Sequence, residues 1–446
     1  MLLSLPEDLV AAVVANLDLL DKCSLACTCR WLDSRAAAEW FRDEEMFLEY
    51  PLTGPDDGVT LAVPSPAWLR RYGLKVKVDI VSEDAEYEMD YLRGARVIHM
   101  QWGTQYGTPK PLPRRGGETL AAMFPELEYL NMTRNNGPMK TFEQLGKMVN
   151  LKSLALLTDS LAGKPDTLTR LTRLESLHYD VDVSVFNRDI PAFLGGMTRL
   201  TSLTLLYDND IPEESSWDSL APLAASLKDL GLVQFDITRL PPVLSQLTQL
   251  TKLVARREVV LDSEEPGYME PDGADVLADI PRLQCLKMKQ MKLKNMPLLP
   301  ATLTELAVNN HGHGLGMWER LGALTQLKNL TLEEIIVDDL PPPVSGLTSL
   351  TRLNLTAMRV QPTATFPPNL DSLRLKATSL SCIPESVSTL TRLRHLFHDK
   401  HLVLGGWEHV PPSVTKLRML RQDSMPEHLV SINDPLYFLS DADDYD

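Results

Sequence analysis

Two short stretches decide the fold of this 446-residue chain: LKNLTL, from Leu327 to Leu332, and LTRLNL, from Leu350 to Leu355. Their shared order (apolar, two residues, apolar, one residue, apolar) occurs thirteen times between Leu127 and Met419. Successive copies begin 20 to 33 residues apart, and most steps are 20 to 24 residues. A period in that range is typical of stacked repeats that each supply one strand. The sequence therefore predicts a solenoid, in which each repeat contacts its neighbours.

The pattern also predicts which side chains are buried. Side chains alternate along a strand, so positions one, four and six of each copy should point into the core and positions three, five and seven outward. Proline follows leucine in several returning segments, such as Leu240-Pro241-Pro242 and Leu340-Pro341-Pro342. Proline fixes φ and lacks an N–H, which favours a short helical or irregular return over a second sheet.

These copies resemble the leucine-rich repeat of the intracellular type, and two shorter copies, beginning at Leu299-Pro300 and Pro367-Pro368, resemble the compact proline-led type. The resemblance implies an α/β fold: a horseshoe solenoid with a parallel sheet on its concave side. We place this solenoid at residues 74–430, with about 13 clear repeats from residue 124 and degenerate ones before it, such as Ala95-Ile98-Met100. Residues 46–73 are expected to form a linker, and residues 431–446 an acidic tail.

Residues 1–45 have no repeat character and predict a small helical domain. Ser4-Leu5-Pro6-Glu7 has the form of a capping box, with a hydroxyl at the N-cap and a carboxylate three residues later. The apolar stripe that continues through Leu9, Val13 and Leu17 predicts the first of three short helices, and the third is expected within 31–50. So small a unit buries little surface by itself, which favours a partner helix.

The run from Leu5-Pro6-Glu7-Asp8-Leu9 to Cys29-Arg30-Trp31 resembles the F-box. The resemblance implies a three-helix F-box-like domain that docks the Skp adaptor, and through it a cullin, in a Skp–cullin–F-box ubiquitin ligase. The residues that it assigns to adaptor binding are Leu5, Pro6, Leu9, Val13, Val14, Leu17, Leu25 and Trp31. The alternative for each is that it forms the core of a small helical cap on the solenoid.

Several function classes find no support in the sequence. The net charge of −16 argues against general nucleic-acid binding. The chain has no phosphate-binding loop, dinucleotide fingerprint, nucleophile elbow or zinc-protease motif, so we expect no enzyme and no cofactor. Cys23, Cys27 and Cys29 lack zinc-finger spacing, and His395 and His398 fall on opposite sides of a strand, so no metal site is expected. An odd number of cysteines, no secretory signal and no run long enough for a membrane span predict a cytoplasmic or nuclear protein.

Charge is distributed unevenly along the outward positions. From Leu250 onward, nine basic residues are predicted on the concave face: Lys252, Arg256, Lys287, Lys289, Arg352, Arg374, Lys376, Lys416 and Arg418. Only three acidic residues, Glu305, Glu333 and Asp399, share these positions, which leaves an excess of six positive charges. The earlier repeats present nearly uncharged residues, such as Tyr129, Asn131 and Ser153. A positive stripe on an acidic body favours an anionic ligand. Solvated charge partly neutralised by Glu258 and Glu334 is the alternative.

Together these patterns predict the non-catalytic substrate-recognition subunit of a Skp–cullin–F-box ligase. The repeats would bind a protein substrate with an acidic or phosphorylated segment, through the nine basic residues. The alternative is a leucine-rich-repeat scaffold in intracellular signalling without a ligase role.

Overall fold

A computed structural model of the chain describes residues 45–50, 74–80, 92–93, 95–102, 120–133, 142–156, 164–181, 190–207, 217–233, 240–256, 275–289, 297–309, 318–333, 340, 342–356, 360–376, 382–398, 405–418 and 425–433. Contacts divide the chain into two compact units. The first consists of Met1–Asp182 with Ala192–Leu200, and the second of Val183–Pro191 with Thr201–Asp446.

The first unit carries six described strands, which follow one another in sequence order within a sheet. The pairings between them are parallel from one repeat to the next. Their bounds are β1 Glu45–Tyr50, β2 Lys75–Ile80, β3 Arg96–Trp102, β4 Tyr129–Met132, β5 Ser153–Leu156 and β6 Ser176–Val181.

The second unit repeats this arrangement with ten described strands, again parallel and in sequence order. Their bounds are β7 Ser202–Tyr207, β8 Asp229–Val233, β9 Lys252–Arg256, β10 Cys285–Lys289, β11 Glu305–Asn309, β12 Asn329–Glu333, β13 Arg352–Thr356, β14 Ser372–Lys376, β15 His395–His398 and β16 Lys416–Arg418.

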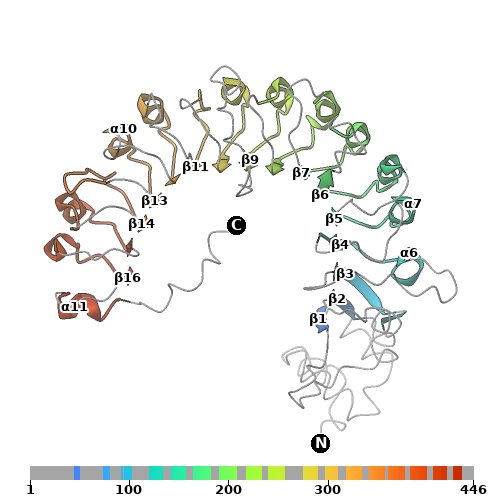
Figure 1. The fold of residues 1–446 in the computed structure, drawn as a ribbon, viewed down its shortest axis with the longest axis horizontal. Helices are drawn as coiled ribbons and strands as arrows, with labels where there is room; N and C mark the ends of the chain where they lie inside the picture. The colour runs from blue at the N-terminus through green and yellow to red at the C-terminus, as the bar shows by residue number, and fades with distance from the viewer. Residues whose placement is uncertain are drawn as a thin grey trace, which may run out of the picture. The chain divides into compact units, whose positions relative to one another are not determined.

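Short helices return the chain between most strands, and in the second unit they lie on the opposite side from the strands (Figure 1). Those of the first unit are α6 Leu120–Met123, α7 Phe142–Leu145, η2 Pro165–Arg170 and η3 Ala192–Gly196. Those of the second are η4 Asp218–Leu223, η5 Pro242–Gln246, η6 Asp275–Asp279, η7 Trp318–Ala323, α10 Pro342–Ser345, η8 Glu385–Thr389, η9 Trp407–His409 and α11 Glu427–Val430. Most are 3₁₀ turns, the tight form that suits short connections.

In two returns of the second unit, the residues that the structure describes include no helix. Between β10 and β11, and between β13 and β14, the described residues form turns and extended chain. These are the two proline-led repeats that begin at Leu299-Pro300 and Pro367-Pro368. Corresponding strand residues there lie 20 positions apart, as in the pair of Leu286 with Leu306. A shorter return therefore still reaches the next strand in register.

The core follows the alternation that the sequence predicts. Leu330 and Leu353 are each 1% exposed, and the next inward residues, Leu332 and Leu355, are fully buried. The outward residues between them, such as Thr331, remain half-exposed. Leucine rows stacked across parallel strands therefore form a continuous interior from repeat to repeat, as a solenoid requires.

The structure corrects two expectations near the start of the solenoid. Glu45–Tyr50 forms strand β1 and pairs with β2, so the segment assigned to the end of a third helix and the start of the linker belongs to the sheet. In β3, the register shifts so that Val97 and His99 pair while Ile98 is skipped. Val97 is consequently 1% exposed, and Ile98, predicted to point inward, is half-exposed. A bulge of this kind moves one residue out of the alternation.

Among the described residues, every helix is too short or too polar to cross a lipid bilayer.

Candidate functional site: the inner face of strands β9–β16

The outward residues of β10–β16 form rows, because neighbouring strands pair residue for residue. The middle row runs across seven strands and consists of Lys287, Ala307, Thr331, Asn354, Arg374, Phe397 and Arg418. Cationic side chains stand at both ends of this row, and three uncharged residues separate Lys287 from Arg374. The register alone thus creates two positive ends, Lys287 at one and Arg374 with Arg418 at the other, with a neutral stretch between them.

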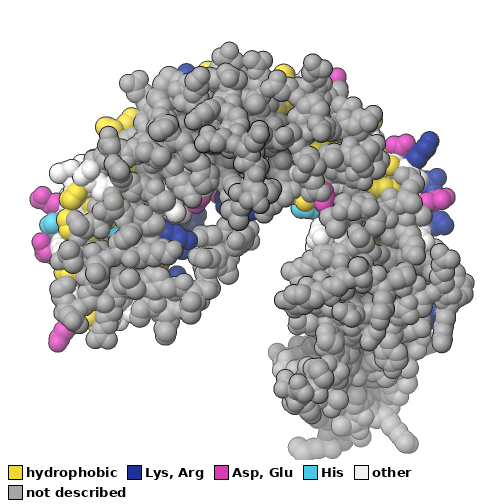
Figure 2. Space-filling view, viewed as in Figure 1, with side chains coloured by type: hydrophobic (Ala, Val, Ile, Leu, Met, Phe, Trp, Pro, Cys, Tyr) yellow, Lys and Arg dark blue, Asp and Glu magenta, His cyan; other side chains and the backbone are white. Residues whose placement is uncertain are grey.

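All nine predicted basic residues lie on β9, β10, β13, β14 or β16, at positions whose neighbours in the strand are buried. Figure 2 shows dark blue side chains gathered on the inner side of the arm that contains β13, β14 and β16 in Figure 1. Five of the nine line one open hollow of about 480 Å³: Lys287, Lys289, Arg352, Arg374 and Arg418. Lys252, Arg256, Lys376 and Lys416 share the face but do not line this hollow.

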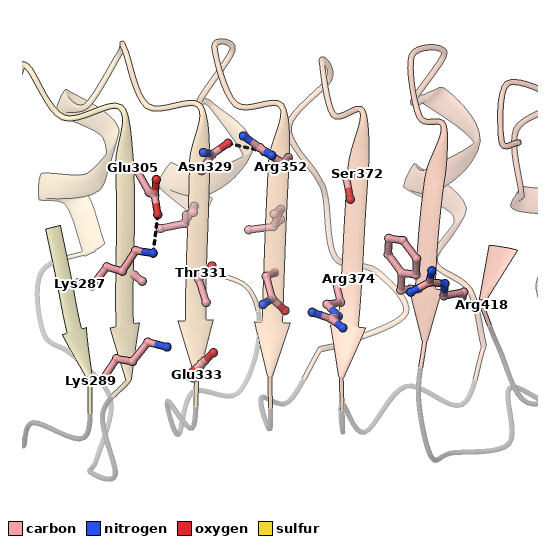
Figure 3. Close-up of a pocket in the computed structure, with 15 residues that line it drawn as sticks. Lys287, Lys289, Glu305, Asn329, Thr331, Glu333, Arg352, Ser372, Arg374 and Arg418 are labelled. Carbon is pink, nitrogen blue, oxygen red and sulfur yellow. Dashed lines mark hydrogen bonds and ion pairs between the residues drawn. The ribbon is translucent and has the colours of Figure 1, made fainter. Parts of the chain in front are cut away.

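Two of these five basic residues interact with an acidic or an amide side chain of a neighbouring strand (Figure 3). Lys287 Nζ lies 3.2 Å from Glu305 Oε1 on the next strand, and the lysine side chain is only 18% exposed. Arg352 Nε donates to Asn329 Oδ1 at 2.7 Å. An ion pair with partly exposed members contributes roughly 0–1 kcal/mol. The pair therefore orients Lys287 more than it stabilises the fold, and it reduces the local charge at that end of the hollow.

Glu333 lies in another row of the hollow. Asn309 Nδ2 donates to Glu333 Oε2 at 3.2 Å, and the side chain of Asn309 comes from the neighbouring strand β11. A carboxylate at the end of β12 disfavours a second negative charge directly above it. Acidic groups of a ligand should therefore lie at the two ends of the hollow, away from β12.

An aromatic ring brings two arginines together at the other end of the hollow. The guanidinium carbons of Arg374 and Arg418 lie 5.9 Å and 5.2 Å from the centroid of the Phe397 ring. These residues occupy directly paired positions of β14, β15 and β16. Both distances fall within the range of cation–π attraction. The ring therefore offers one surface on which two planar, five-donor cations are held.

One thiol lies beside the lysine end. Cys285 begins β10 and is half-buried, and burial, followed by the negative charge of Glu305, raises its pKa to about 11. Thiols react as thiolates, so this cysteine is poorly suited to nucleophilic chemistry near neutral pH. Among the described residues, no group of three or more His, Cys, Asp or Glu side chains is arranged to hold a metal ion.

The first unit has a different face. His99 stacks on Tyr129 with ring centroids 3.9 Å apart and planes 2° from parallel. Its charged residues are matched across strands: Arg96 pairs with Glu126 at 2.6 Å, and Lys152 with Glu128 at 2.8 Å. These side chains line a smaller hollow of about 330 Å³. Four basic and three acidic side chains line this hollow, so its excess of positive charge is smaller than that of the hollow in the second unit.

Sequence reasoning did not assign Phe397, the residue of the hollow that contacts two arginines. Phe397 is apolar, so an inventory of charge passes over it, although its position between two inward residues of β15 was legible from the repeat. Thr331, Asn354 and Ser372 were likewise not assigned, yet they line the hollow between its cationic ends. Asp399, Glu258 and Glu334, and all eight residues assigned to adaptor binding, lie outside the described residues.

Comparison with known proteins shows limited similarity. No family model matches the chain. The chain is 25% identical over 291 residues to the volume-regulated anion channel subunit LRRC8D of Rattus norvegicus. That match covers 63% of this chain and 30% of the channel subunit, so the chain spans less than a third of this relative.

Two solved structures align with this chain at low similarity. A leucine-rich-repeat protein of Leptospira interrogans aligns with a TM-score of 0.45 and 16% identity, over 82% of this chain and 87% of that one. An internalin, InlF, of Listeria monocytogenes aligns with a TM-score of 0.39 and 14% identity, over 82% and 89%. The repeats themselves carry the conclusion: one parallel strand per period, with leucines stacked inside, is the leucine-rich-repeat solenoid.

Proposed function

We propose that this chain is a non-catalytic protein-binding module that captures an acidic segment of a partner on the inner face of β9–β16. The observation that carries the proposal is the hollow lined by Lys287, Lys289, Arg352, Arg374 and Arg418. A concave surface of this kind binds an extended ligand, and its positive potential within an acidic chain attracts negative charge.

We further propose that the bound partner is a substrate for ubiquitin transfer. In this role the F-box-like residues 1–45 dock the Skp adaptor, and the repeats present the substrate within the cytoplasm or nucleus. The support is the sequence from Leu5 to Trp31 together with the repeats that follow it. The rival role, a signalling scaffold, uses the same inner face but needs no adaptor.

The experiment for the inner face is a binding series with a fluorescent peptide that carries several glutamates. Lys287→Glu combined with Arg374→Glu should weaken binding, because each reversal replaces attraction by repulsion and slows association. Rising salt should weaken the wild-type complex, since exposed charges are screened beyond about 10 Å at 0.1 M. The control is Lys152→Glu in the first unit, which should leave affinity unchanged. Salt-independent binding, or equal affinity of the doubly reversed variant, would overturn this site.

The adaptor role has a separate experiment. The full chain should co-purify with a recombinant Skp adaptor and cullin, and replacing Leu5 and Pro6 by Ala should abolish this. The double variant should keep its affinity for the acidic peptide, which shows that the solenoid is still folded. Failure of the wild type to retain the adaptor would favour the signalling scaffold.

A further inference from the structure

The hollow contains two unlike cationic ends, and their difference points to a more specific ligand. At one end Lys287 already shares its charge with Glu305. At the other end Arg374 and Arg418 lie against Phe397, with guanidinium carbons 5.9 Å and 5.2 Å from the ring centroid. A lysine is a compact point charge, whereas a guanidinium is a planar fork that pairs with two oxygens at once.

The arginine end suits a phosphate monoester better than a carboxylate. A phosphorylated side chain carries a charge of about −1.5 to −2 and three acceptor oxygens, enough to engage two guanidinium forks. A carboxylate offers two oxygens and one charge, which a single arginine satisfies. Contact with the Phe397 ring restricts both arginines before a ligand arrives, so less side-chain entropy is lost on binding.

The strand spacing sets the distance between the two ends. Lys287 and Arg374 occupy the same row on β10 and β14, four strand intervals apart. Parallel neighbours lie roughly 4.8 Å apart, which gives about 19 Å. An extended peptide covers about 3.3 Å per residue, so roughly six residues separate a group at one end from a group at the other.

The middle of the hollow selects against charge. Ala307, Thr331 and Asn354 stand between the ends in the same row, and Glu333 lies beside them. A ligand with negative charge along its whole length would place some of it over Glu333, where like charges repel. A ligand with charge only at its two ends avoids that cost.

Building on the function proposed above, we propose that the hollow binds a partner segment with a phosphorylated serine or threonine at Arg374 and Arg418, and an acidic residue about six positions away at Lys287 and Lys289. The intervening residues of the segment are uncharged and lie across β11–β13. The pattern is a spaced pair of anionic groups, and the two groups are not interchangeable.

The test uses the full chain and synthetic fluorescent peptides in an anisotropy assay. Each peptide carries one phosphoserine and one glutamate, separated by three, six or ten positions of serine, alanine and glycine. Matched peptides replace phosphoserine by glutamate or by serine. The phosphopeptide with a six-position spacing should bind most tightly. Its affinity should exceed that of the matched glutamate peptide by about tenfold, as expected when charge-assisted hydrogen bonds are lost.

Variants assign the effect to the arginine end. Arg374→Gln with Arg418→Gln should remove the preference for phosphate, and Phe397→Leu should weaken phosphopeptide binding about two- to fivefold while keeping an apolar side chain. The matched control is Lys328→Gln, which removes one positive charge from the second unit at an exposed position that does not line the hollow. It should change affinity less than twofold, a change of the size expected for one screened charge.

The outcomes separate this inference from the broader function. If the glutamate peptides bind as tightly as the phosphopeptide, the hollow recognises negative charge and not phosphate. If the three spacings give equal affinities, it does not recognise the distance between the two groups. Either result contradicts the proposed ligand. If no acidic peptide binds, with or without phosphate, the proposed function of the inner face fails as well. Inorganic phosphate should displace the phosphopeptide from the wild type. If it displaces the peptide equally well from the doubly substituted arginine variant, the arginine site is excluded.

Discussion

Leu330 of β12 and Leu353 of β13 occupy directly paired positions, and each side chain is only 1% exposed. Neighbouring repeats therefore share one leucine row, and the burial of each residue depends on the presence of the next repeat. This arrangement couples the stability of adjacent repeats, although each repeat is short in sequence.

Leu330→Ala should lower the free energy of unfolding by about 2–5 kcal/mol through lost burial and an unfilled cavity. Its matched control is Thr331→Ala, a half-exposed neighbour on the same strand, which should cost well under about 1 kcal/mol. Urea unfolding followed by circular dichroism measures both. Similar midpoints for the two variants would contradict the register described for β12.

Gly406 offers a test of backbone geometry. Its φ is 82°, and a Cβ there would lie 2.5 Å from the carbonyl oxygen of Ile383. Gly406→Ala should therefore destabilise the end of the solenoid by about 1–2 kcal/mol from conformation alone, and by more from the close contact. Gly405→Ala is the control, because a Cβ at that position meets open space. Thermal unfolding of the two variants should separate them clearly, and equal midpoints would count against the left-handed conformation.

The raised pKa of Cys285 predicts slow alkylation. A thiol with a pKa of about 11 in place of 9.0 has roughly a hundredfold less thiolate near pH 8, and alkylation by iodoacetamide should slow in proportion. Peptide mass spectrometry measures the rate in the folded chain and in urea, where the ordinary value should return. Glu305→Gln removes the second cause of the shift and should accelerate the reaction. A folded-state rate equal to that in urea would contradict the burial of this thiol.

His99 should make the first unit sensitive to mild acid. Burial, assisted by the positive charge of Lys77, lowers the pKa of His99 below 6.5, although Glu45 partly opposes the shift. The unfolded chain therefore binds a proton more readily than the folded chain as pH falls below 6.5. The contribution of neutral His99 to stability is complete above pH 6.5 and is lost as pH falls toward the lowered pKa.

The measurement for His99 is the thermal midpoint between pH 7.5 and 5. His99→Phe keeps a ring to stack on Tyr129, 3.9 Å away in the wild type, but cannot be protonated. The variant should lose less stability than the wild type over this range, and other titrating groups cancel in the difference. Parallel pH profiles for the two proteins would refute the lowered pKa.

Sequence periodicity predicted the inward leucines and the face that carries the basic residues, because both follow from one repeat and side-chain alternation. The parallel strands were expected from the resemblance to leucine-rich repeats. It failed at Ile98, where a register shift in β3 is a property of two paired strands and leaves no mark in one. It also failed at Glu45–Tyr50, which pairs with β2 without carrying the repeat phrase.

The candidate hollow was predictable only in part. Register placed Lys287, Arg374 and Arg418 on one face, but the pairing of Lys287 with Glu305 depends on side-chain conformations that charge counting does not supply. The role of Phe397 depends on two arginines from different strands meeting one ring. The three residues come from three different strands, so the pattern within any one strand does not predict that they meet.

Because each repeat supplies one strand, the distance between two residues in one row of the inner face of β10–β14 is a whole number of strand intervals. Gaining or losing one repeat between Lys287 and Arg374 would move the arginine end by a whole strand interval, roughly 4.8 Å, which is between one and two residues of an extended peptide. Intermediate separations are not accessible by adding repeats. Homologous chains that differ by one repeat in this region should therefore prefer peptides of discretely different length, and their specificities should diverge in steps.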